Sequence, residues 1–253
     1  PLPAVLLTLF LEVSAPVAAL IVSPVTSGGG LIPPTEGYLR GVREICDRTG
    51  ILLIFDEVVN GFGRTGQMFG HQNWGVEPDI ICFAKGLTGG YMPLSATVVK
   101  QHIFEAFLDE PGTNSHFRHI STYGGTPVST AVALRNIEII ERENLAERAA
   151  EMGEYLMERM QRLLDHPNVG DVRGKGLLLG VELVKDKASK EPLEDASVAS
   201  VAKRCLEQRV LIGRNACTIP GFANVLIVCP PLVISYEEAD RLVNSLESAI
   251  LAL

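Results

Sequence analysis

Apolar runs and amphipathic stretches alternate along the first half of the chain. Short runs rich in Ile, Leu and Val predict four buried strands, at 17–22, 51–55, 80–84 and 95–99. Between the first two, apolar residues recur at the spacing of a helix over 35–49, and Gly50 predicts its end. Near-continuous apolar strands of this kind are typical of an α/β sheet that is covered on both faces.

The second half has a different pattern. Helical spacing predicts long helices over 127–142 and 145–164, and the composition then shifts toward an α+β pattern. The predicted elements of this part are a strand, a helix, two short strands and a final helix: 177–183, 196–208, 210–212, 225–228 and 236–251. We therefore expect two domains, a large-domain portion at 1–150 and a smaller C-terminal domain at 151–253.

The first 24 residues are rich in Leu, Val and Ala, but they do not read as a signal peptide or a membrane span. They have no basic leader, and Glu12 and Pro16 interrupt the apolar run. We interpret this stretch as a cut through a longer protein, at a helix that leads into a buried strand.

Composition excludes some classes of function. The 253 residues are 47% hydrophobic, enough for a sizeable core, and a formal net charge of −8 argues against a nucleic-acid partner. The five cysteines are scattered without C-x-x-C spacing, and the five histidines lack metal-ligand spacing. We therefore expect no metal site, no membrane partner and a reducing compartment, the cytoplasm.

Two ionisable residues follow predicted strands. Asp56 ends the run 51–55, and Lys85 ends the run 80–84, 29 residues later. Alone, such an Asp is usually a turn cap and a Lys before Gly is usually solvated. Together they can share one rim of a parallel sheet, where ligands of α/β proteins bind. A lysine amine attacks carbonyls, and an aspartate keeps the pyridine nitrogen of pyridoxal phosphate (PLP) protonated, so this pair suits PLP chemistry.

Two further stretches are less specific. The glycine-rich stretch 61–66 lacks the Lys-Ser/Thr ending of a nucleotide loop, so we expect a mobile turn beside Asp56. The stretch 119–127 offers hydroxyls and N–H groups just before a long helix, which suits a phosphate. Ordinary capping by Thr126, with Pro127 in the first helical position, explains it equally well.

The order and spacing of several motifs resemble the class III (ω-type) PLP-dependent aminotransferases, in their C-terminal portion. The shared motifs are Asp56-Glu57-Val58, Gly61-Phe62-Gly63-Arg64-Thr65-Gly66, Pro78-Asp79-Ile80, Ala84-Lys85-Gly86-Leu87, Thr122-Tyr123-Gly124-Gly125, Val172-Arg173-Gly174-Lys175-Gly176-Leu177 and Pro230-Pro231-Leu232. Each motif is weak alone, but together they span nearly the whole chain. The stretches 118–125 and 213–225 most resemble the taurine–pyruvate group of this class.

The resemblance implies a fold-type-I large domain and a set of residue roles. Lys85 would form the internal aldimine and move the substrate proton, and Asp56 would bind the pyridinium nitrogen. Val58 would pack on the ring, and Thr122 would bind the phosphate across a homodimer, or a dimer of dimers. The implied reaction is ping-pong, with an ω-amino acid such as taurine or β-alanine as amino donor and pyruvate, a 2-oxo acid, as acceptor.

The chain departs from the family at two positions. Ser23 stands where the family usually has Glu, and Ile227 stands near the position where many members have Arg. In those members the Glu neutralises the Arg, so losing both is coherent, because a buried unpaired Arg is costly. We expect another residue, Arg214, to handle an acid group of the substrate.

A larger departure is that the family's N-terminal half is missing from this sequence. That half supplies a phosphate-gripping loop and a ring-stacking aromatic residue, so we expect the chain alone to be weakly active or inactive. Two alternatives stay open beside transamination. One is another class III reaction, racemisation or decarboxylating transamination, and the other is a truncated subunit that serves as an assembly partner.

Overall fold

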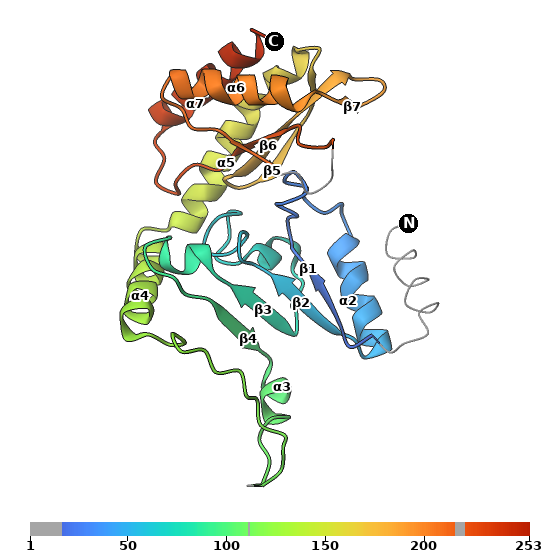
Figure 1. The fold of residues 1–253 in the computed structure, drawn as a ribbon, viewed down its shortest axis with the longest axis vertical. Coiled ribbons are helices and arrows are strands. Elements are labelled where there is room, and N and C mark those ends of the chain that lie inside the picture. Colours follow the sequence, from blue (N-terminus) through green and yellow to red (C-terminus); the bar gives the residue numbers. More distant parts are fainter. Residues whose placement is uncertain (1–16, 111, 216–220) are drawn as a thin grey trace.

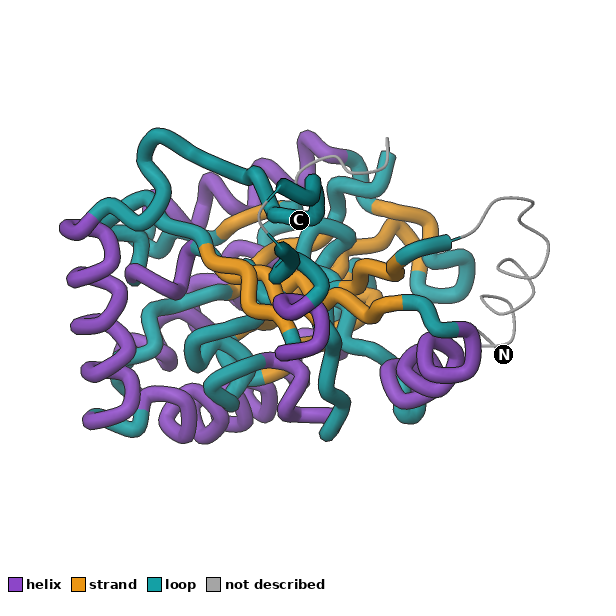
Figure 2. The backbone as a smooth tube through the Cα atoms, turned by 90° about the horizontal axis from the view of Figure 1, so that it is seen from below, coloured by secondary structure: helices purple, strands orange, loops and turns teal. Residues whose placement is uncertain are grey.

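The protein is built around two sheets, seen in a computed structural model that describes residues 17–110, 112–215 and 221–253. One sheet carries strands β1 to β4, and the other carries β5 to β9. Helices α4 and α5 run along one side of the molecule from the first sheet to the second (Figure 1). In a view from below, the strands pass through the middle of the molecule and helices lie at its sides (Figure 2).

The first sheet is mixed. Its strands are β1 (Ala19–Val22), β2 (Leu52–Asp56), β3 (Ile80–Phe83) and β4 (Ala96–Val99), in that spatial order. Strands β1, β2 and β3 are parallel, and β4 is antiparallel to β3. The α/β architecture predicted from the sequence is confirmed. Helix α2 (Tyr38–Thr49) turns its apolar side, including Leu39 and Val42, toward Leu53 and Phe55 of β2.

Coverage of this sheet on both faces is wrong for the described residues. In β2, Leu53 and Phe55 are buried on the α2 face, whereas the alternate residues Leu52 and Ile54 are only half-buried. On the edge strand β1, Ile21 is 62% exposed. The apolar runs correctly predicted strands, but they could not tell which face finds a partner within this chain.

The connections after β4 form an arm. It contains the short helix α3 (Gln101–Glu105) and the segment 106–126, which has no helix or strand among its described residues. Figure 1 shows this arm extending away from both sheets. Helix α4 (Pro127–Arg142) then begins at the proline, as predicted, and α5 (Leu145–Gln161) follows, ending in the 3₁₀ helix η3 (Arg162–Asp165).

The second sheet is antiparallel. Its strands are β5 (Val169–Lys175), β6 (Leu178–Asp186), β7 (Glu191–Pro192), β8 (Gly213–Arg214) and β9 (Val225–Val228). They are ordered β5-β6-β9-β8, with β7 paired to β6. Helices α5, α6 (Asp195–Glu207) and α7 (Tyr236–Ile250) pack their apolar sides on this sheet and complete the largest core.

Two sequence predictions in this part are wrong. The apolar residues at 210–212 are not a strand, because they belong to the turn that ends α6: Arg209 has φ 63° and Val210 N donates to Cys205 O. Pairing starts only at Gly213. Strand β5 was not predicted, because Gly170, Asp171 and Arg173 break the apolar alternation by which strands are recognised.

Helix α5 crosses the expected domain division without a break. Leu145, at its start, packs with the first sheet's Phe83, whereas Met152 and Leu156 lie in the core of the second sheet. A division at 150/151 therefore stays a prediction. None of the described helices is long and apolar enough to span a membrane. The helix expected before β1 falls in 1–16, outside the described residues.

Candidate active site

Asp56 is the last residue of β2 and sits on the face of the sheet that α2 does not cover. It is half-buried, and its Oδ1 accepts a hydrogen bond from Val58 N at 3.0 Å. Within the described residues, no donor is bonded to Oδ2. The side chain of Val58 is also half-buried. Asp56 thus keeps one carboxylate oxygen available to a ligand above the sheet.

Lys85 lies just beyond the end of the neighbouring strand. In the parallel register Asp56 is opposite Cys82, so Lys85 follows three residues after the partner of Asp56. The two residues therefore follow adjacent strands at one edge of the sheet, as the sequence predicted. Lys85 is exposed and has no ion pair in the part of the chain that the structure describes.

The backbone holds Lys85 in an unusual conformation. Its φ is 41°, in the left-handed region that residues with a Cβ seldom adopt. Lys85 opens the 3₁₀ helix η2 (Lys85–Thr88), in which Leu87 N donates to Ala84 O at 2.9 Å. From helix α4, Asn136 Nδ2 donates to Gly86 O at 2.7 Å. Such strain persists only where surrounding contacts hold it, and here they fix the backbone that carries the lysine.

The glycine-rich turn beside Asp56 is packed, and the expectation of a mobile turn is wrong. Gly61, Phe62 and Gly63 are all buried. A Cβ on Gly66 would lie 2.9 Å from the Cβ of Ala150 in α5. The glycines are needed because the turn lies close against helix α5.

The turn is also tied to the second sheet. Arg64 Nη1 donates to Pro230 O at 2.6 Å and to Leu177 O at 3.2 Å. The segment next to Asp56 is therefore fixed to both halves of the fold.

The other two predicted site residues lie elsewhere. Thr122 is exposed on the arm 106–126, and the structure gives it no contact with Asp56 or Lys85. Arg214 is on β8, where its Nη1 pairs with Asp195 Oδ1 at 2.7 Å. A role for Thr122 in phosphate binding and for Arg214 in binding a substrate acid group both stay predictions.

A buried carboxylate beside Asp56 received no role from the sequence. Glu57 is fully buried, and its oxygens accept hydrogen bonds from Gly70 N and His71 N. Strand alternation offered a signal, because Glu57 follows Phe55 by two residues and so points to the opposite face from Asp56. A charged residue on a core-facing position implies a structural partner.

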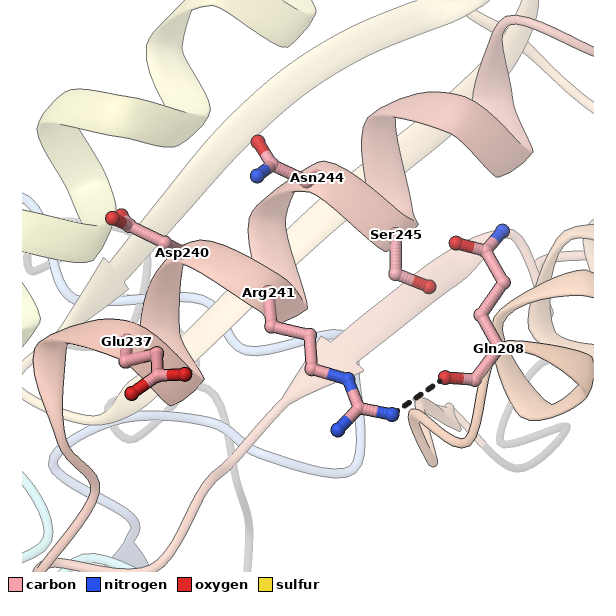
Figure 3. Close-up of a pocket in the computed structure, with 6 residues that line it drawn as sticks. All are labelled: Gln208, Glu237, Asp240, Arg241, Asn244 and Ser245. Atoms are coloured by element: carbon pink, nitrogen blue, oxygen red, sulfur yellow. Dashed lines mark hydrogen bonds between the residues drawn. The ribbon is translucent and has the colours of Figure 1, made fainter.

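The surface hollows of the described structure lie away from this pair. One is polar and runs along helix α7, where Arg241 Nη2 donates to Gln208 O at 3.1 Å (Figure 3). It is lined by Gln208, Glu237, Asp240, Arg241, Asn244 and Ser245. A second, more apolar groove runs beside β9 and includes Ile227 and Cys229. Neither hollow contains Asp56 or Lys85, so the candidate active site rests on the sheet edge and not on a cavity.

The residues at this edge fit PLP. A carboxylate with a free oxygen can accept the pyridinium N–H, and a nearby exposed primary amine can react with the cofactor's aldehyde. No group of three or more His, Cys, Asp or Glu within the described residues could hold a metal ion. The donors present at the site are thus those that an organic cofactor with a protonated ring nitrogen needs.

Comparison with known proteins defines the class. The family model described as aminotransferase class-III matches residues 4–250, so the chain belongs to the class III aminotransferase family. Members of this family depend on PLP. Its structural neighbours include a Bacillus anthracis aminotransferase, at a TM-score of 0.96 and 47% identity over 99% of this chain and 56% of that one. An amine transaminase from an uncultivated Pseudomonas species, in the PLP-bound (internal aldimine) form, matches at a TM-score of 0.92 and 40% identity, over 99% of this chain and 56% of that one.

Curated relatives narrow the comparison further. An uncharacterised aminotransferase of Bacillus subtilis, YhxA, is 47% identical over 94% of this chain and 53% of its own length. The taurine–pyruvate aminotransferase of Bilophila wadsworthia is 46% identical over 91% of this chain and 51% of its own length. The chain thus spans about half the length of the curated relatives it matches.

Proposed function

We propose that this chain is the cofactor-carrying part of an aminotransferase that moves an amino group from an ω-amino acid, such as taurine or β-alanine, to pyruvate. The observation that carries the proposal is the placement of Asp56 and Lys85 after adjacent parallel strands, on one edge of the sheet. The 46% identity to a taurine–pyruvate aminotransferase supports the choice of donor and acceptor.

Each residue has a defined task in this proposal. The carboxylate of Asp56 accepts the pyridinium N–H and keeps that nitrogen protonated. Lys85 Nζ binds the cofactor's aldehyde carbon and later, as a free amine, takes the proton from the substrate carbon and returns it one position along. Val58 packs against the ring. PLP, when bound, supplies the electron sink that makes this proton removable.

The arm 106–126 supports a second subunit as part of the site. Ile120 is 90% exposed and Tyr123 is 84% exposed, and both flank Thr122. Large apolar side chains that stand so far out of a chain usually meet a partner. We therefore propose a homodimer in which Thr122 of one subunit contacts the phosphate bound in the other. A cytoplasmic location stays a prediction from the cysteine pattern.

Replacing the lysine tests the proposal. We expect the protein to acquire the visible absorbance of lysine-bound PLP, and the Lys85→Ala variant to lose it while it still folds. Lys203→Ala, an exposed lysine on α6, is the matched control and should keep the absorbance. Absorbance that is unchanged in Lys85→Ala would overturn the proposal.

The donor is tested in the same preparation. Taurine or β-alanine alone should convert the visible band to that of pyridoxamine phosphate, in stoichiometric amount and without CO₂ release. Pyruvate added afterward should restore the band and yield alanine. Release of CO₂ would instead favour the decarboxylating alternative.

A further inference from the structure

The buried carboxylate of Glu57 stands directly behind the candidate site. Glu57 N donates to Cys82 O at 3.0 Å, which extends the β2–β3 pairing one residue past Asp56. Because side chains alternate along a strand, Asp56 points to the open face and Glu57 into the core. The two neighbouring carboxylates thus have opposite surroundings, one open to a ligand and one enclosed by protein.

The surroundings of Glu57 are three N–H donors from one segment. Gly70 N lies 2.6 Å from Oε2, His71 N lies 2.7 Å from Oε1, and His71 Nδ1 lies 2.9 Å from Oε1. An ionised carboxylate only accepts, so Nδ1 carries the proton of the third contact. His71 is stacked on Phe69 at 6.0 Å between ring centroids. A buried charge is stable only when it is hydrogen-bonded in this way, so the segment and the carboxylate fix each other.

The fit around Glu57 is close. A Cβ on Gly70 would lie 2.9 Å from Glu57 Oε2 and 2.8 Å from Asn60 Cβ. Only glycine lets the backbone N–H come this near to the carboxylate. Glu57 O also accepts from Gly61 N at 2.9 Å, so the same residue starts the turn that follows.

That turn reaches the lysine. A Cβ on Gly86, the residue after Lys85, would lie 3.1 Å from Phe62 Cβ and 3.4 Å from Gly61 O. The turn begun at Glu57 therefore supports the backbone on which Lys85 sits at φ 41°. Glu57 adjoins Asp56 in sequence and is linked to Lys85 through Gly61 and Phe62.

We propose that Glu57 is a positioning residue, which uses its hydrogen bonds to Gly70 and His71 to set the distance between Asp56 and Lys85 for the cofactor. It touches neither cofactor nor substrate. The inference rests on the proposed function, since it concerns how the PLP pair is held. It goes beyond that function in assigning a task to a residue outside the site.

The test is the affinity for PLP of Glu57→Gln, which keeps the volume but turns an N–H₂ group toward Gly70 N. We expect the Kd for PLP, measured by absorbance titration, to rise about tenfold or more, because a buried charged hydrogen bond is lost. Hydrogen exchange at the Gly70 and His71 amides should accelerate. Glu44→Gln, an exposed glutamate on α2, is the matched control and should leave both values unchanged.

A second variant keeps the test decisive if Glu57→Gln folds poorly. His71→Phe retains an aromatic ring beside Phe69 but removes the Nδ1 donor, and it should raise the Kd for PLP by a smaller factor, about threefold. Both variants binding PLP as tightly as the parent would overturn the positioning role, even if they melt at a lower temperature. Failure of the parent chain to bind PLP would count against the proposed function itself.

Discussion

The carboxylate of Asp79 is the most strongly held acid among the described residues. It accepts hydrogen bonds from Leu53 N at 2.8 Å, Arg43 Nη1 at 2.8 Å and Lys100 Nζ at 2.9 Å. Burial alone would raise the pKa of Asp79, but the hydrogen bonds from Leu53, Lys100 and Arg43 outweigh it and lower the pKa to about 2. Asp79 thereby ties strand β2 to helix α2 and to the end of β4.

Stability should therefore depend on this one residue in acid. A pKa lowered on folding stabilises the native state above the unfolded pKa of about 3.9, and the contribution is lost as the pH falls through about 2. We expect Asp79→Asn to lower the free energy of unfolding by about 2 kcal/mol at neutral pH.

The difference between Asp79→Asn and the parent should shrink between about pH 4 and pH 2. Urea unfolding at several pH values measures it. Asp47→Asn, which removes the exposed partner of Arg43, is the control. A pH-independent difference would contradict the assignment.

At the same scale, the sequence could predict which residues carry chemistry but not what holds them. Asp56 and Lys85 were predicted because each follows an apolar run. The left-handed backbone of Lys85 and its contact with Asn136 could not be predicted, because they depend on residues 50 positions apart that only the fold brings together. Glu57 could be assigned to the core face by alternation, but its donors Gly70 and His71 leave no local signal.

Among the elements, helix α5 makes the closest approach to a neighbour. A Cβ on Gly153 would overlap the backbone of Gly176, and a Cβ on Gly176 would lie 2.5 Å from the carbonyl carbon of Thr65. The helix, the turn before β6 and the glycine-rich turn after β2 thus meet backbone to backbone. Periodicity predicted α5 from its apolar residues, but this contact depends on the absence of a side chain.

Gly153→Ala separates helix propensity from packing. Alanine stabilises a helix interior by about 1 kcal/mol relative to glycine, so an isolated α5 would gain stability. In the protein, overlap with Gly176 should more than cancel this, and the free energy of unfolding should fall by roughly 1–3 kcal/mol. The urea midpoint measures it, and Glu154→Ala, exposed on the same helix, should have little effect. A raised midpoint in Gly153→Ala would show that the approach is looser than described.

On the scale of the whole molecule, the first sheet leaves a face that nothing in the described chain covers. Ile21 stands 62% exposed there, on the same face as Asp56. The relatives are about twice as long as this chain. Apolar strands with one open face are what a sheet has when its second layer is missing.

We therefore expect the chain alone to form alanine from taurine and pyruvate far more slowly than a relative of full length. A coupled assay for alanine measures it, with the Bilophila wadsworthia taurine–pyruvate aminotransferase as the positive control. Turnover by the purified 253-residue chain at a rate near that of the control would refute this expectation.

Sequence pattern predicted the α/β class and most elements, since helices and strands depend on local periodicity. It did not predict strand β5, the arm's extension, or the open face, because these depend on partners that a pattern does not identify.

The unbroken helix α5 limits how substrate can reach Lys85. The helix starts in the core beside Phe83 and ends in the core of the second sheet. Arg64 adds a second fixed link to Pro230. A door that opens by swinging the two sheets apart would have to bend a helix and break that link. Entry to the lysine must therefore be through smaller gates, the loops around it, while the two sheets move as one wall.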